Sequence, residues 1–247
     1  MLRRAFLVLL VLLCAAVVVA FQVTRSAKAG GQARVFVPSP RFYMDFSPSY
    51  RTSIADAYWL YAIQYYGQHV HGDQRYDSLP ALLDLITQLS PGFKEAYLFG
   101  AFALIDARRP DLSYSLLERG FRNNPDDWRF PAYLGFFAYT YAGGKDKDLV
   151  AAQWYAKAAG LPGRPAYVPR LAATLTAKGG RRAKAMTLWA QIYATGDTYS
   201  KQKAVAALDQ LLPVGKQARM QAVATLEGTM SSAQLNDLIA ELFKGYR

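Results

Sequence analysis

From Ser53 to the C-terminus, apolar residues recur three and four positions apart, and no stretch alternates convincingly with a period of two. Spacings of three and four place apolar side chains on one face of a helix, so the pattern predicts helices rather than strands. Turn-forming residues divide the pattern into segments of about 12–18 residues. Helices of this length cannot each bury an apolar face alone, so they are expected to stack. The turn signals lie at His71-Gly72, Pro91-Gly92, Arg109-Pro110, Asn124-Pro125, Gly143-Gly144, Pro162-Gly163, Gly179-Gly180, Gly196 and Pro213.

The helical pattern has an internal period. Pro91 and Pro125 lie 34 residues apart, each just before a predicted helix. This period, with small residues at fixed positions between large ones, resembles the tetratricopeptide repeat. Small residues let two helices touch, and large residues fill the space to the next repeat. The residues that carry the resemblance are Tyr58, Tyr61, Ala62 and Tyr65 in the first repeat; Tyr97, Gly100, Ala101, Leu104, Leu117 and Gly120 in the second; Leu134, Gly135, Ala138, Ala151, Tyr155, Ala158 and Pro162 in the third; and Leu171, Ala172, Leu175, Ala183, Thr187 and Ala190 in the fourth.

The resemblance implies an all-α fold, a right-handed superhelical solenoid of antiparallel helix pairs. About four such hairpins would occupy residues 53–195, and an irregular helical bundle is the alternative. Residues 196–247 match no repeat well. They predict capping helices at Thr198–Leu212, Val214–Gly228 and Ser231–Lys244, the last with a capping box of Ser231 and Gln234.

The N-terminus predicts one membrane segment. Residues 5–21 are 17 apolar residues without a charge, just enough to span a bilayer as a helix. We therefore interpret residues 1–22 as an uncleaved transmembrane anchor in the inner (cytoplasmic) membrane, with the body on the periplasmic side. A signal peptide cleaved after Ala20 or Ala29 is the alternative. Residues 23–52 predict an extended Pro-containing linker, in which residues 41–46 either pack on the first repeat or contact a partner.

Positive charge gathers at the two ends of the chain. The net charge is +11, with +5 over residues 1–50 and +7 over residues 164–247. The C-terminal excess predicts a basic surface suited to lipid headgroups or an acidic partner, while nucleic acid is disfavoured because no reading motif accompanies the charge. The residues of this surface are Arg164, Arg170, Lys178, Arg181, Arg182 and Lys184.

The repeat resemblance also implies a partner-binding groove along the first helix of each pair. The groove would be apolar and aromatic and would suit a helix or apolar segment of another protein. Alternatively the superhelix is too tight to leave it open, and the same residues are core. The implied groove residues are Trp59, Ile63, Tyr66, Leu98, Phe102, Arg129, Phe136 and Tyr139, with Ala166, Pro169, Ala173 and Thr176 in the fourth repeat.

The sequence offers few residues from which a catalytic or metal site could be built. The chain has one Cys and two His, and no nucleophile, base and orienting group occur together. His69, His71 and Asp73 are residue types that can bind a metal ion. They lie in an inter-helix loop, however, and the two histidines have no third strong ligand nearby in the sequence. We expect no catalytic, cofactor or metal site and no enzyme. The expected function is a membrane-anchored scaffold that helps to assemble or stabilise a bacterial envelope complex; the alternative is a permanent accessory subunit of such a complex.

Overall fold

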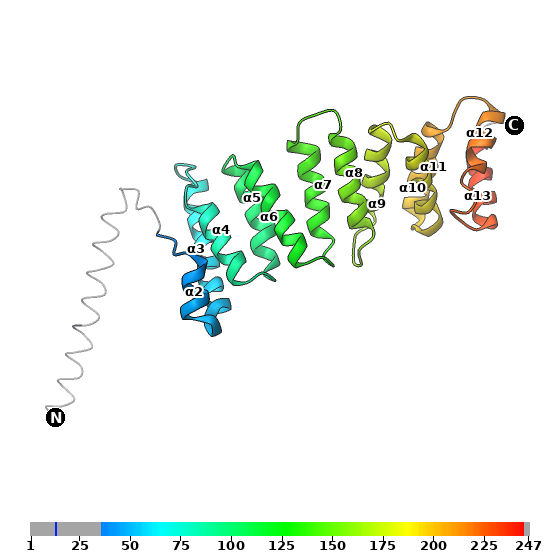
Figure 1. Ribbon diagram of the computed structural model, residues 1–247. Coiled ribbons are helices and arrows are strands. Elements are labelled where there is room, and N and C mark those ends of the chain that lie inside the picture. The colour runs from blue at the N-terminus through cyan, green and yellow to red at the C-terminus, as the bar shows by residue number, and fades with distance from the viewer. Residues whose placement is uncertain (1–12, 14–35, 245–247) are drawn as a thin grey trace. The chain divides into compact units, whose positions relative to one another are not determined.

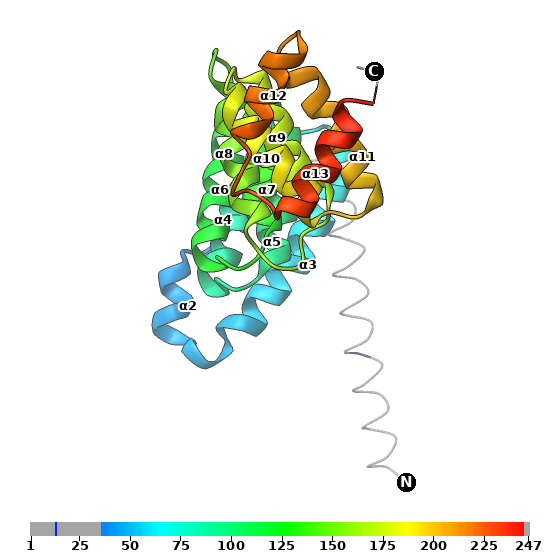
Figure 2. The ribbon, with the colours of Figure 1, turned by 90° about the vertical axis from the view of Figure 1, so that its right-hand side faces the viewer.

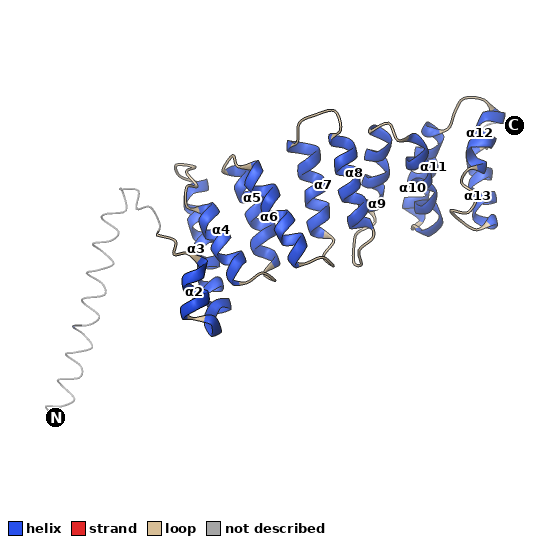
Figure 3. Ribbon diagram, in the orientation of Figure 1, coloured by secondary structure: helices blue, strands red, loops and turns tan. Residues whose placement is uncertain are grey.

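The structure is a computed structural model that describes residue 13 and residues 36–244. Apart from Leu13, the expected anchor at residues 1–22 lies outside the described residues, as does the linker as far as residue 35. Within the described part of the chain every regular element is helical (Figures 1 and 3). None of the helices described there has both the length and the apolar character that crossing a membrane requires.

The helices of the body follow one another as antiparallel neighbours from α2 to α13 (Figure 1). From α3 to α11 each helix packs mainly on the helix before it and the helix after it, whereas α2 packs on α4 and α13 packs on α11. The bounds are α2 Pro40–Phe46, α3 Arg51–Val70, α4 Leu79–Leu89, α5 Lys94–Asp106, α6 Pro110–Asn123, α7 Arg129–Tyr141, α8 Lys147–Ala159, α9 Tyr167–Lys178, α10 Arg182–Thr195, α11 Thr198–Leu211, α12 Lys216–Ala224 and α13 Ser232–Leu242, with a 3-10 helix at Pro48–Tyr50.

The odd-numbered helices α3, α5, α7, α9 and α11 are called the first helices here, and α4, α6, α8 and α10 the second helices. In Figure 2, α4, α6 and α8 lie toward one side of the body, and α3, α5 and α11 toward the other. An all-helical body of adjacent pairs is the arrangement that the spacing of apolar residues predicts, and it is compatible with a helical repeat.

Glycines stand where two helices approach most closely. A Cβ added at Gly135 of α7 would lie 2.8 Å from the Tyr155 ring of α8, and one at Gly100 of α5 would lie 2.7 Å from Leu83 of α4. A Cβ at Gly120 of α6 would likewise collide with the ring of Phe130. A methyl group at any of these positions would force the neighbouring side chain to shift in a packed contact between helices. The expected close-approach role of the three glycines is confirmed.

The segment before the first repeat differs from expectation. Extended geometry does not hold over residues 40–50, because Pro40–Phe46 form α2 and Pro48–Tyr50 a 3-10 turn. Proline is tolerated in the first helical turn, where its missing N–H costs nothing, so a proline can open a helix as well as break one. The Tyr43 hydroxyl lies 2.8 Å from the Tyr58 hydroxyl of α3, and α2 also packs on α4. The alternative in which residues 41–46 pack on the first repeat is therefore correct.

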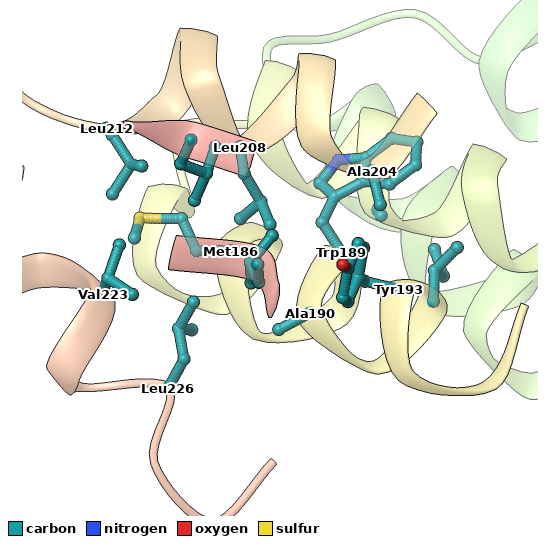
Figure 4. Close-up of a cluster of buried hydrophobic side chains, with 13 residues drawn as sticks. Met186, Trp189, Ala190, Tyr193, Ala204, Leu208, Leu212, Val223 and Leu226 are labelled. Atoms are coloured by element: carbon teal, nitrogen blue, oxygen red, sulfur yellow. The ribbon is translucent and has the colours of Figure 1, made fainter. Parts of the chain in front are cut away.

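The C-terminal helices cover the last pair with their own apolar core. Met186, Trp189 and Tyr193 of α10 meet Leu208 of α11 and Val223 of α12 (Figure 4). The capping box at the start of α13 is confirmed. The expected helix at Val214–Gly228 is shorter, Lys216–Ala224: Gly215, with a left-handed φ of 101°, precedes its start, and residues 225–228 form turns after its end.

Candidate protein-binding surface

Aromatic rings join neighbouring first helices. The Trp59 ring of α3 packs edge-on against Phe99 of α5, with centroids 5.3 Å apart. Phe102 of α5 packs edge-on against Phe137 of α7 at 5.2 Å. Further along, the ring of Trp128, which precedes α7, lies 6.5 Å from that of Tyr167. These contacts hold the first helices side by side and leave parts of several rings facing outward.

One of these ring clusters spans α5 and α7 and is called the aromatic patch. Phe102 lies edge-on to Tyr133 at 5.2 Å and 6.4 Å from Phe136, and Phe136 lies 6.4 Å from Tyr141. Phe137 is buried and supports the others, whereas Phe102, Phe136 and Tyr141 are 41%, 38% and 46% exposed. The patch therefore combines fixed geometry with a solvent-facing apolar surface. Its residues are Phe102, Tyr133, Phe136, Phe137 and Tyr141.

Two of the expected groove residues belong mainly to the packing of α3 on α5. Trp59 is half-buried between Phe93 and Phe99. Tyr66 stacks on Tyr76 and donates its hydroxyl to Asp106, and this hydrogen bond, with burial, raises the pKa of Tyr66 to about 12. These two side chains fasten helices together more than they offer a free surface.

The remaining expected groove residues lie in different surroundings. Leu98 is only 8% exposed and forms part of the core, while Ile63 is 39% exposed on α3. Tyr139, although on α7, does not share ring contacts with the aromatic patch; its hydroxyl lies 3.4 Å from Lys178 Nζ of α9. Of the three residues expected to share one groove, Phe102 and Phe136 therefore lie in ring contact and Tyr139 lies apart from them.

Arg129 is occupied within the chain. Its guanidinium donates to Asp127, with Nη2 2.7 Å from Oδ2, and it lies 3.7 Å from Glu95. Lys94 Nζ approaches the same Asp127 oxygen at 3.1 Å. The hydrogen bonds from the Arg129 side chain and backbone, with Lys94, lower the pKa of Asp127 to about 2 against the opposing effect of burial. Arg129 therefore fastens α7 to the start of α5 and is not available to hold a partner's carboxylate.

The six expected basic residues do not form one surface. Arg170 Nη1 donates to Ser200 Oγ at 2.8 Å, and its guanidinium lies over the Tyr199 ring, so it links α9 to α11. Lys178 lies against Tyr139. The other four line a cleft between α8 and α10: Arg164, Arg181, Arg182 and Lys184. In the fourth repeat, Ala166, Pro169 and Thr176 line this cleft as well, so their expected place along the first-helix groove is wrong.

The histidine motif lies at the end of α3. His69 Nδ1 is 2.7 Å from the Tyr65 carbonyl oxygen, and its Nε2 is 3.8 Å from Asp73 Oδ1. His71 is exposed in the following turn. Over residues 36–244, no three His, Cys, Asp or Glu side chains gather closely enough to hold a metal ion.

No family model matches this chain, and no curated protein sequence matches it either.

Proposed function

We propose that this protein is a membrane-anchored scaffold of the tetratricopeptide type, with a right-handed superhelical body. It would help to assemble or stabilise a membrane complex of a bacterial cell envelope. The paired helices and the glycines at Gly100, Gly120 and Gly135 support the repeat assignment, because the repeat pattern places small residues at helix contacts. The apolar run at residues 5–21 supports the anchor, and Arg3 and Arg4 before it favour a cytoplasmic N-terminus with the body on the periplasmic side of the inner membrane.

The aromatic patch is the observation that carries the binding function. Its three exposed rings, Phe102, Phe136 and Tyr141, are contributed by two adjacent helices and are held by edge-on contacts. Rigid, partly exposed aromatic side chains lose little conformational entropy on binding and are enriched among the residues that dominate interface energetics. An apolar segment or amphipathic helix of a partner protein is the ligand that suits this surface.

The second candidate function, a permanent accessory subunit, draws support from α2. Three large side chains of α2 and one of the following 3-10 turn are exposed, although α2 packs on the first repeat. In a permanent subunit this segment would be buried against the adjoining protein. The uncovered side chains are Phe42, Met44, Phe46 and Tyr50.

Affinity purification of the full chain from detergent-solubilised membranes, followed by mass spectrometry, tests both functions. If the protein is a scaffold that acts in assembly, its partners are expected to co-purify in substoichiometric amounts and to be released on prolonged washing. A permanent subunit is expected to recover them at constant stoichiometry through gel filtration. Recovery of no envelope protein above a tag-only control would contradict both.

The anchor is tested separately by fractionation. The chain is expected to stay with membranes after a carbonate wash and to keep residues 1–30 in its intact mass. A mature protein that begins at Phe21 or Gly30 would show that the leader is cleaved.

A further inference from the structure

Long side chains bridge the first two gaps between consecutive second helices. Between α4 and α6, Arg119 Nη1 lies 2.7 Å from Asp84 Oδ1, and its Nη2 donates to Thr87 Oγ1 at 2.9 Å. Between α6 and α8, Trp154 Nε1 donates to the Tyr114 hydroxyl at 2.6 Å. Among the described side chains, no hydrogen bond or ion pair joins α8 to α10. The third gap is instead a cleft.

This cleft runs the length of the two helices. It consists of two hollows of about 730 and 600 Å³, and Ala156 of α8 and Leu188 of α10 line both, so the hollows adjoin each other. Its α8 wall extends from Leu149 to Gly160, which covers almost the whole helix. At 1.5 Å per residue the 13 residues of α8 measure roughly 20 Å.

The α8 wall and the floor of the cleft carry several small side chains, whereas the bridged gaps have large ones. Ala152, Ala156 and Ala159 stand on the α8 wall, and Ala166 and Ala172 on the floor provided by α9 and the residue before it. Alanine side chains leave room for the large apolar side chains of an inserted helix, which can pack between two walls as ridges into grooves. The cleft therefore has the length, the floor and the apolar lining of a helix-binding site.

The cleft carries an excess of positive charge at one end. Arg181 and Lys184 line one end and Arg164 the other, and none of these side chains forms an ion pair with a described residue. Asp197, the one acidic side chain among the described residues that line the cleft, lies at the Arg164 end and offsets that charge; it also caps α11, accepting from the Ser200 backbone amide at 2.7 Å. Unpaired positive charge around an apolar cleft favours a negatively charged ligand by complementarity.

We propose that the cleft between α8 and α10 binds an amphipathic helix of a partner protein, with apolar side chains on its inserted face and acidic side chains at the end that meets Arg181 and Lys184. This surface is separate from the aromatic patch and lies on the side of the second helices, so the inference does not depend on the proposed function. A protein helix is favoured over a lipid surface because the site is a concave channel with a floor, whereas a bilayer surface is flat and would reach only the rims.

Two synthetic peptides of 14 residues test the cleft on the full-length protein in detergent, with binding followed by fluorescence anisotropy. The first carries leucines three and four positions apart and glutamates elsewhere; the second has the same composition with the leucines spread around the helix. The patterned peptide is expected to bind at least tenfold more tightly than the dispersed one. Ala156→Trp, which fills the middle of the cleft, is expected to weaken its binding at least tenfold, and Ala81→Trp on the exposed surface of α4 is the matched control.

Charge and location are tested on the same peptide. Arg181→Glu with Lys184→Glu is expected to weaken binding at least tenfold, whereas Lys145→Glu with Lys216→Glu, which leaves the net charge of the variants equal, is expected to leave it unchanged. Absence of saturable binding, binding unaffected by Ala156→Trp, or binding lost on Phe136→Ala instead would overturn the proposal. Displacement of the peptide by vesicles of anionic lipid, with no displacement by zwitterionic vesicles, would assign the basic residues to the membrane and overturn it as well.

Discussion

The rings of Phe102 and Phe136 lie 6.4 Å apart on neighbouring first helices, at positions separated by 34 residues in the chain. The same separation divides Pro91 from Pro125, so the period that orders the turns also brings these two rings together. Residues one period apart in the sequence therefore lie next to each other on neighbouring repeats, and here they form an exposed aromatic surface where two repeats meet.

Gly135→Leu is expected to destabilise the protein by about 1–3 kcal/mol or more, because the new side chain would overpack the contact between α7 and α8. A Cβ there already lies 2.8 Å from the Tyr155 ring and 3.2 Å from the Ala151 carbonyl oxygen. Thermal unfolding measures the effect. Gly67→Leu is the control, since Gly67 is also helical but has nothing within 4 Å of an added Cβ; equal melting temperatures for the two variants would mean that the register is wrong.

Asp127→Asn is expected to reduce the free energy of unfolding at neutral pH by roughly 1–2 kcal/mol, because it removes a carboxylate held by Arg129 and Lys94. The pKa of Asp127 is about 2 in the folded chain and 3.8 without these contacts. A lowered folded-state pKa stabilises the protein above 3.8, and this stabilisation is lost as the pH falls toward 2. Denaturant unfolding across this range should show the difference between wild type and variant shrinking on acidification. A difference that stays constant down to pH 2 would contradict the assignment.

Ser231→Ala is expected to destabilise α13 and lower the free energy of unfolding by about 1 kcal/mol. The reason is that Ser231 Oγ accepts a hydrogen bond from the backbone amide of Gln234 and so closes the capping box. Gln234 also donates to the Ala194 carbonyl oxygen at 2.9 Å and so fastens α13 to α10. Hydrogen exchange of α13 amides reports the loss locally. Ser232→Ala, one residue later and exposed, is the matched control and should leave exchange unchanged.

The fold could be predicted where local chemistry and apolar spacing agree. Gly135 faces Tyr155 as the repeat pattern requires, and Ser231 caps α13 as its spacing to Gln234 indicates. The helix α2 was missed because proline was interpreted as a signal for extended chain, although Pro40 stands in the first turn, where a helix accepts it.

The candidate surface was predicted only in part because repeat position does not fix exposure. Leu98 occupies a groove position by register, yet the neighbouring helices bury it. Tyr139 lies one turn from Phe136, yet its hydroxyl contacts Lys178 of α9 and its ring lies outside the aromatic patch. The cleft between α8 and α10 was missed because alanines such as Ala156 carry the same sequence signal whether a neighbouring helix covers them or solvent does.

Phe136→Ala, assayed on one preparation for thermal unfolding and for partner recovery from membranes, tests the central claim most directly. Because Phe136 is 38% exposed, truncation is expected to cost about 1–2 kcal/mol of stability, less than the ~3–5 kcal/mol expected for Phe130→Ala, whose ring is fully buried. Partner binding is expected to weaken by about 2 kcal/mol, the loss typical of an interface hot spot. Unchanged partner recovery by the folded Phe136→Ala protein, whatever its stability, would contradict the account of the aromatic patch as a binding surface.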